Sequence, residues 1–265
     1  MRGGLHDLPA TGQRETAPGP TNTRRQPAMT PARLQTLRTA LDRRQPDLTV
    51  VMENVCKPHN LAAVARTLEA VGGLEIHAIS QLRSLRLSQM SAAGVRKWIR
   101  VHKHADIDDA ARQLHAQGYQ LIATTLSDTA SDFRDIDYTR PSAIVVGEEY
   151  DGLSTRASAL ADHHVFIPMY GMVQSLNVSV ASALVLYEAC RQREAAGMYA
   201  SRRLDEASYR KLLFEACHPQ VAAYCRQRKL PYPAIDDQAQ IIGTVAGSGQ
   251  RQNPDFAHWM KNLEG

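Results

Sequence analysis

Hydrophobic residues in the middle of this sequence fall into short runs, and longer segments with helical periodicity separate the runs. The runs are rich in Val, Ile and Leu, which is typical of buried strands. The intervening segments repeat apolar residues every three to four positions, which predicts amphipathic helices. The predicted strands are Leu48–Met52, Leu74–Ile79, Ile99–His102, Tyr119–Thr124, Ala143–Val146 and Val165–Ile167. The predicted helices are His59–Val71, Asp106–Gln117, Ser154–Asp162 and a longer one at Asn177–Arg193.

Strands that alternate with helices indicate an α/β fold with a mostly parallel sheet that helices cover on both faces. We assign this core to residues 48–195. In open sheets of this class, ligands bind at the carboxyl ends of the strands. We therefore expect the loops that follow the predicted strands to contain the functional residues.

The segments that flank the core have different patterns. Residues 29–47 predict a basic helix, because Thr30 suits the N-cap position and Leu residues follow at helical spacing. Residues 196–265 predict a helical extension without strands, interrupted at Leu230–Pro233. Residues 1–28 contain no Ile, Val or Phe. We expect them to be a disordered tail or a mis-assigned start, dispensable in either case.

The overall composition is that of an ordinary globular protein, with 265 residues, 43% hydrophobic and 22% charged. The net charge of +4 permits a nucleic acid partner without requiring one. No apolar run approaches the length of a membrane span, and the N-terminal region lacks the apolar segment of a secretory signal, so we predict a cytoplasmic protein. The four cysteines form no CxxC pair, so we expect free thiols and no metal site.

Three loops that follow predicted strands combine turn residues with polar side chains. They are Asn54–Arg66, Gly147–Ser154 and Ile167–Ser179. Taken singly, each admits a simple structural role, with Asn60 or Asn177 as a helix cap and the acidic residues as solvated loop charges. Taken together, they predict a crevice that binds a flat, partly apolar ligand through backbone groups.

Several familiar motifs are absent from the sequence. It contains no GxGxxG after a strand, no GxxxxGK[ST], no GxSxG and no HExxH. A Rossmann oxidoreductase and a Rossmann methyltransferase are therefore not supported. The residues alone predict an α/β enzyme-like domain with helical extensions.

The three loops resemble the motifs of the SpoU/TrmH family of RNA 2′-O-methyltransferases, part of the SPOUT superfamily. The first motif is Asn60-Leu-Ala-Ala-Val-Ala-Arg66, the second is Gly147–Leu153 (GEEYDGL), and the third, Ile167–Ser179 (IPMYGMVQSLNVS), matches without a departure. The resemblance extends over about residues 29–235. Further segments resemble the branch of the family that modifies tRNA, namely Arg43–Val50, Lys57–Asn60, Asp132–Pro141, Gly197–Tyr199 and Leu230–Pro233.

The resemblance implies a SPOUT α/β knot, a deep trefoil knot, that binds S-adenosylmethionine, and a homodimer with the site near its interface. It implies methyl transfer to the ribose 2′-hydroxyl of guanosine 18 in the D-loop of tRNA, without a metal, because the methyl donor already carries the electrophile. The cofactor-binding residues that it implies are Thr124, Gly147, Ile167, Met169 and Leu176. The catalytic residues that it implies are Asn60, Arg66, Glu149, Ser175 and Asn177.

The resemblance makes Arg66 the central catalytic residue, but its role stays open. A guanidinium does not ordinarily give up its proton, so we favour a clamp on a neighbouring phosphate that also stabilises the oxyanion. A base is the alternative, and Glu149 is another candidate proton acceptor. Basic residues that are candidates for RNA contact, or simply for solvated surface, are Arg33, Arg38, Arg43, Arg44, Arg202 and Arg203.

Two other functions remain as alternatives at this stage. The same motifs serve enzymes that methylate another tRNA position or ribosomal RNA. A non-catalytic RNA-binding protein on a SPOUT scaffold is a more remote possibility, which the intact set of motif residues disfavours.

Overall fold

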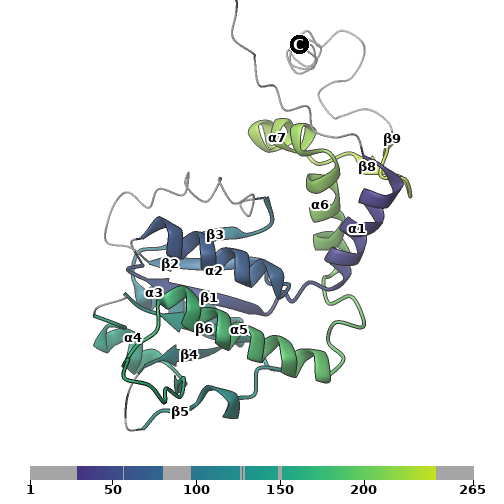
Figure 1. Ribbon diagram of the computed structural model, residues 1–265. Helices are drawn as coiled ribbons and strands as arrows, with labels where there is room; N and C mark the ends of the chain where they lie inside the picture. Colours follow the sequence, from purple (N-terminus) through teal and green to yellow (C-terminus); the bar gives the residue numbers. More distant parts are fainter. Residues whose placement is uncertain are drawn as a thin grey trace, which may run out of the picture.

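A seven-stranded parallel sheet forms the centre of the protein (Figure 1). The computed structural model describes residues 29–55, 57–79, 97–125, 127, 129–148 and 151–242. The strand order is β3-β2-β1-β6-β4-β7-β5, and each neighbouring pair runs parallel. The strands are β1 (Leu48–Glu53), β2 (Glu75–Ile79), β3 (Arg100–His104), β4 (Gln120–Thr124), β5 (Ser131–Asp132), β6 (Ser142–Val146) and β7 (His163–Phe166).

Helices cover both faces of this sheet, and further helices lie beside it (Figure 1). No described helix is both long and apolar enough to span a membrane. The helices are α1 (Pro31–Asp42), α2 (Pro58–Ala70), α3 (Ile107–Ala116), the short 3-10 helix η3 (Phe133–Asp135), α4 (Thr155–Leu160), α5 (Val178–Ala195), α6 (Glu206–Cys217) and α7 (Pro219–Arg228).

The central strands are mostly apolar because both faces of the sheet are covered. Every residue of β1 and of β6 is buried. Successive side chains point to opposite faces, so Val50 and Met52 pack with α2 and α5, whereas Val51 packs with α3 and α4. This explains why the strands read as continuous apolar runs rather than as alternating patterns.

The N-terminal helix and the C-terminal extension form a separate hydrophobic cluster beside the sheet (Figure 1). Leu34, Leu37 and Leu41 of α1 pack with Tyr209 and Leu213 of α6. Thr30 caps α1 as predicted, since its side chain accepts a hydrogen bond from the Arg33 N–H. The two ends of the described chain are thus packed together, although the whole of the sheet separates them in the sequence.

The predicted α/β class and the six predicted strands are confirmed, with shifts of one or two residues at their ends. The prediction of an extension without strands is wrong, because β8 (Ala234–Ile235) and β9 (Ile241–Ile242) form an antiparallel pair. The Asp236 carboxylate closes the turn between them by accepting from the N–H groups of Gln238 and Gln240, each at 2.8 Å. Strands of two residues, which also include β5, are too short to produce an apolar pattern.

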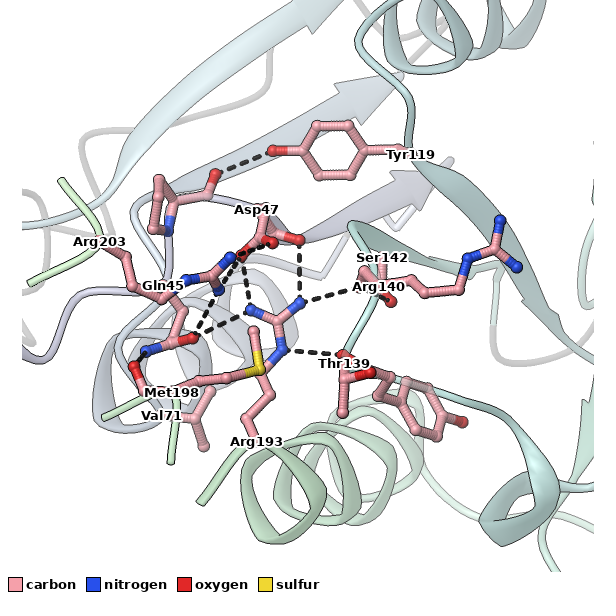
Figure 2. Close-up of polar contacts among 12 residues, drawn as sticks. Gln45, Asp47, Val71, Tyr119, Thr139, Arg140, Ser142, Arg193, Met198 and Arg203 are labelled. Carbon is pink, nitrogen blue, oxygen red and sulfur yellow. Dashed lines mark hydrogen bonds and ion pairs between the residues drawn. The ribbon is translucent and has the colours of Figure 1, made fainter. Parts of the chain in front are cut away.

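The C-terminal end of α5 contacts the start of β1 through a fully buried arginine (Figure 2). Arg193 donates to the Asp47 carboxylate at 2.6 Å and to the backbone oxygens of Tyr138 and Arg140 at 2.9 and 3.0 Å. Arg203 donates to the same carboxylate at 2.7 and 2.9 Å. This network joins α5, the start of β1, the loop before β6 and the C-terminal extension.

Candidate active site

A cavity of about 450 Å³ lies at the carboxyl ends of β4, β6 and β7. Its position is the one expected for a ligand site in a parallel α/β sheet, and its size falls within the range of roughly 300–1,000 Å³ typical of small-molecule sites. All five residues that the family resemblance assigns to cofactor binding line this cavity, and so does Ser175. These five residues are Thr124, Gly147, Ile167, Met169 and Leu176.

The loop after β6 is shaped by two glycines. A Cβ atom on Gly147 would lie 2.0 Å from the carbonyl oxygen of Gly152, so no side chain fits there. Gly152 itself has a φ of +67°, a conformation that favours glycine. Glu148 and Gly152 exchange two backbone hydrogen bonds, at 2.9 and 3.0 Å, which close the loop. Glu149 lies outside the described residues.

The charged residues that line the cavity are both acidic. Glu148 and Asp151 contribute carboxylates, and no Lys, Arg or His is among the described lining residues. The rest of the lining is backbone, small polar groups and apolar side chains. The cavity is therefore complementary to a partly apolar ligand that carries positive charge. Sequence reasoning gave these two carboxylates no role; their place directly after a buried strand was the available signal.

Asn60 and Asn177 meet between the starts of two helices. The Asn177 side chain donates to the Asn60 side-chain oxygen at 3.3 Å, and Asn60 is buried. Asn177 also caps α5, as the simple structural explanation predicted, because its side chain accepts from the Ser179 N–H at 2.9 Å. Asn60 is not a cap: α2 begins at Pro58 after the N-cap residue Lys57, which places Asn60 in the first turn. The structure thus brings two predicted site residues together.

Arg66 lies elsewhere on α2. Six residues along a helix correspond to a rotation of about 240° from Asn60, so the two side chains leave different faces. Arg66 is exposed and is not one of the residues that line the cavity. The single chain therefore positions a cofactor-sized cavity and the Asn60–Asn177 pair, but presents the predicted catalytic arginine to the surface.

Two of the six arginines predicted to contact RNA are held by carboxylates of the protein itself. Arg44 is buried, forms an ion pair with Glu69 at 3.0 Å, and donates to the Gly73 carbonyl oxygen at 3.1 Å. Arg203 is held by Asp47. Contact of Arg44 and Arg203 with RNA stays a prediction, which these protein contacts disfavour.

The other four arginines differ in how far protein groups engage them. Arg38 donates to the Asp237 carbonyl oxygen at 2.6 Å. Arg202 lies 3.9 Å from the centre of the Tyr209 ring and forms an ion pair with Glu206 at 2.9 Å. Arg43 is exposed, and Arg33 is half-buried on α1. These four stay candidates for contact with RNA.

No group of three or more His, Cys, Asp or Glu side chains in the described part of the chain is arranged to hold a metal ion. Of the cysteines, Cys190, Cys217 and Cys225 are free thiols, and Cys56 lies outside the described residues. Burial raises the pKa of the Cys217 and Cys225 thiols above the ordinary value. A raised pKa disfavours the thiolate that a metal or an electrophile would need.

Comparison with known proteins identifies the family to which this chain belongs. The model of the SpoU rRNA Methylase family matches residues 47–187, and a model of the C-terminal part of SpoU rRNA methylases matches residues 191–244. The chain belongs to the SpoU methylase family. The predicted resemblance is therefore confirmed, and with it the SPOUT fold.

Two curated members of the SpoU methylase family are similar over almost their whole length. The tRNA (guanosine(18)-2′-O)-methyltransferase of Escherichia coli is 51% identical over 215 residues, which are 80% of this chain and 94% of that protein. The enzyme of the same name from Thermus thermophilus is 49% identical over 184 residues, which are 69% of this chain and 95% of that protein.

Solved structures from the SpoU family agree with the fold. A TrmH/SpoU tRNA modifying enzyme from Aquifex aeolicus has a TM-score of 0.65 at 39% identity, over 72% of this chain and 97% of that one. An AdoMet-bound rRNA methyltransferase from Sinorhizobium meliloti has a TM-score of 0.50 at 28% identity, over 58% and 59% of the two chains. The family is one of S-adenosylmethionine-dependent RNA methyltransferases.

Proposed function

We propose that this protein transfers a methyl group from S-adenosylmethionine to the ribose 2′-hydroxyl of guanosine 18 in tRNA. The observation that carries the proposal is that the motif residues assigned to the cofactor all line one cavity. The activity named for the relatives from Escherichia coli and Thermus thermophilus supports the choice of tRNA and of the nucleotide.

The cavity is our proposed site for S-adenosylmethionine. When bound, this molecule supplies an electrophilic methyl carbon on a positively charged sulfonium. Ile167, Met169 and Leu176 offer apolar contact. Glu148 and Asp151 offer negative charge that complements the cation. The tight backbone approach at Gly147 leaves main-chain groups, rather than a side chain, to contact the ligand.

The acceptor ribose is proposed to bind beside this cavity, close to Asn60 and Asn177. Their hydrogen bond joins the first turn of α2 to the start of α5, so we propose that the pair orders the loop before α5, part of which lines the cavity. Ser175 lies close to Asn177 in the sequence, lines the cavity and would shape the site around the methyl group. Glu149 is the proposed proton acceptor if Arg66 acts as a clamp on phosphate rather than as a base.

We further propose that the protein forms a homodimer through the outer face of α5. Val180, Leu184 and Tyr187 follow helical spacing and are 47%, 41% and 57% exposed. The loop before α5 adds Tyr170 and Met172, which are 97% and 98% exposed. Exposed apolar side chains grouped in this way are typical of an interface between proteins. It borders the proposed active site, because the same loop lines the cavity.

Substitution of Leu184 by glutamate is expected to convert the homodimer to a monomer, because a charge in an apolar interface loses its hydration. Light scattering after size-exclusion chromatography measures the molar mass. Gln220→Glu, an equivalent charge change at an exposed position of α7, is the control and leaves the mass at that of a dimer. A wild-type protein that elutes as a monomer at micromolar concentration would refute the proposed dimer.

Ribosomal RNA is the second candidate substrate, because the matching family model and the structural relative from Sinorhizobium meliloti are both described as rRNA methylases. Arg33, Arg38, Arg43 and Arg202 are the remaining candidates for contact with either RNA. Contacts to phosphate give affinity rather than site choice, so these residues do not distinguish the two substrates.

The test of the proposed reaction uses purified protein, S-adenosylmethionine labelled in its methyl group, and unmodified tRNA transcripts. We expect label on the ribose of guanosine 18, and none in a matched transcript whose guanosine 18 carries a 2′-deoxyribose. Ribosomal RNA serves as competitor. Label at another tRNA position, or only in ribosomal RNA, would support the methyl-transfer reaction but refute guanosine 18 of tRNA as its substrate. Failure to bind S-adenosylmethionine would favour a non-catalytic RNA-binding protein.

A further inference from the structure

β1 ends in a buried carboxylate that contacts one distant residue twice. Glu53 is 5% exposed. One of its carboxylate oxygens accepts from the backbone N–H of Ser154 at 2.8 Å, and the other accepts from the Ser154 hydroxyl, also at 2.8 Å. The two residues are 101 positions apart in the sequence. Both oxygens of the carboxylate are therefore occupied by a single partner residue.

Ser154 stands at the end of the loop that lines the cavity. The loop runs from Gly147 to Leu153, and five of its residues contribute to the lining. Ser154 then caps α4, because its hydroxyl oxygen accepts from the Ala157 N–H at 3.0 Å. The backbone pairing of Glu148 with Gly152 closes the start of the loop, and the contact of Ser154 with Glu53 fixes its other end.

A carboxylate is an unexpected residue at the end of β1. The rest of the strand is apolar except for Thr49, and all six positions are buried. Within the described residues Glu53 forms no ion pair, so the two groups of Ser154 supply its hydrogen bonds. Burial of a charged group costs free energy unless hydrogen bonds compensate for it. An apolar residue at this position would avoid the cost of burying a charge. We therefore explain the carboxylate by the two hydrogen bonds with which it holds Ser154.

Glu53 also precedes the turn that leads to the other half of the site. Asn54 has a φ of 52°, in the left-handed region, and its N–H donates to the Ile79 carbonyl oxygen at 2.8 Å. The chain then enters α2, which carries Asn60 and Arg66. Glu53 is thus placed between the loop that lines the cavity and the segment that carries the proposed acceptor-side residues.

We infer that Glu53 is a positioning residue for the proposed methyl transfer, which holds Asp151–Ser154, the end of the loop that lines the cavity, in the conformation that binds S-adenosylmethionine. The role in binding S-adenosylmethionine rests on the proposed function. The contact between Glu53 and Ser154 does not depend on it. Without the carboxylate, the end of the loop loses both hydrogen bonds and opens more often. The affinity for S-adenosylmethionine falls, whereas the groups that act on the ribose stay in place.

The experiment compares Glu53→Ala and Glu53→Gln with Thr49→Val. Glutamine keeps one oxygen for the Ser154 N–H and gains an amide that can donate to the Ser154 hydroxyl, so it is the conservative rescue. Thr49→Val removes a part-buried hydrogen bond of 2.6 Å to the Glu75 carbonyl oxygen at the start of the same strand, the end away from the cavity, so it controls for loss of stability.

For Glu53→Ala we expect the KM for S-adenosylmethionine to rise about tenfold, the size of effect that follows from losing hydrogen bonds to a charged acceptor. The kcat at saturating S-adenosylmethionine and the KM for tRNA stay close to wild type. Hydrogen exchange at the Ser154 amide becomes at least about tenfold faster. Glu53→Gln restores most of both values, and Thr49→Val changes neither.

Each alternative result is decisive. An unchanged KM for S-adenosylmethionine in Glu53→Ala, or an equal rise in Thr49→Val, would overturn the positioning role. If Glu53→Ala does not fold, Ser154→Ala removes one of the two hydrogen bonds and is expected to raise the same KM; no rise there would count against the inference. A wild-type protein that binds no S-adenosylmethionine would refute the proposed function. Hydrogen exchange at the Ser154 amide would in that case still test the contact between Glu53 and Ser154.

Discussion

Replacement of Arg193 by methionine is expected to lower the free energy of unfolding by about 3–5 kcal/mol, the cost typical of removing one partner from a buried ion pair. Methionine retains the apolar stem of the side chain but none of its donors. The backbone oxygens of Tyr138 and Arg140 then lose the hydrogen bonds that this guanidinium donates. Urea denaturation followed by circular dichroism measures the change.

Arg203→Met is the matched control for this prediction. Arg203 donates to the same Asp47 carboxylate, but its side chain is 28% exposed whereas that of Arg193 is 0% exposed. We expect a loss of roughly 1 kcal/mol for Arg203→Met, near the range for ion pairs open to solvent. Equal losses in the two variants would show that the buried position of Arg193 contributes nothing beyond the ion pair.

The pH dependence of stability gives a second readout on the Arg193 variant. Burial acts to raise the pKa of Asp47, but hydrogen bonds from Arg203 and the charge of Arg193 outweigh it, so the pKa lies below the ordinary 3.8. A carboxyl whose pKa is lowered by folding stabilises the protein above its ordinary pKa, and this contribution is lost as the pH falls through the folded value. Arg193→Met is expected to reduce that acid-dependent loss.

The sequence was sufficient to predict six of the seven strands of the sheet and the position of the cavity. Buried parallel strands appear as apolar runs, and the carboxyl ends of such strands meet at one edge. Three motifs that follow β1, β6 and β7 therefore had to converge, and the residues that they assign to the cofactor do line one cavity. Thr124, at the end of β4 between β6 and β7, joins them because of the strand order.

Partners of charged residues were beyond what the sequence could predict. Arg43 and Arg44 are adjacent and equivalent in the sequence, yet one is exposed and the other is buried against Glu69. A pattern of charges shows where cations occur but not which carboxylate or carbonyl group binds them. The same limit hid the contact between Glu53 and Ser154, because no periodicity connects a strand end to a loop 101 residues later.

Arg66→Ala is expected to reduce kcat for tRNA methylation by roughly 1,000-fold, the upper part of the range for loss of one group that stabilises a developing oxyanion. The affinity for S-adenosylmethionine is expected to stay unchanged, because Arg66 is exposed on α2 and does not line the cavity. Single-turnover methylation measures the first quantity and calorimetric titration the second. Arg112→Ala, at an exposed arginine of α3, is the control and retains full activity.

Arg66→Lys separates the clamp from the base. Lysine keeps the positive charge but lacks the fork that binds phosphate in a bidentate way, so a clamp predicts partial activity with an unchanged pH–rate profile. Lysine also releases its proton more readily than arginine. A base at this position therefore predicts a profile whose rising limb moves to lower pH in the variant. Normal turnover in Arg66→Ala would exclude both roles, and a parallel loss of cofactor affinity would instead place Arg66 in the cofactor site, contrary to the geometry of the single chain.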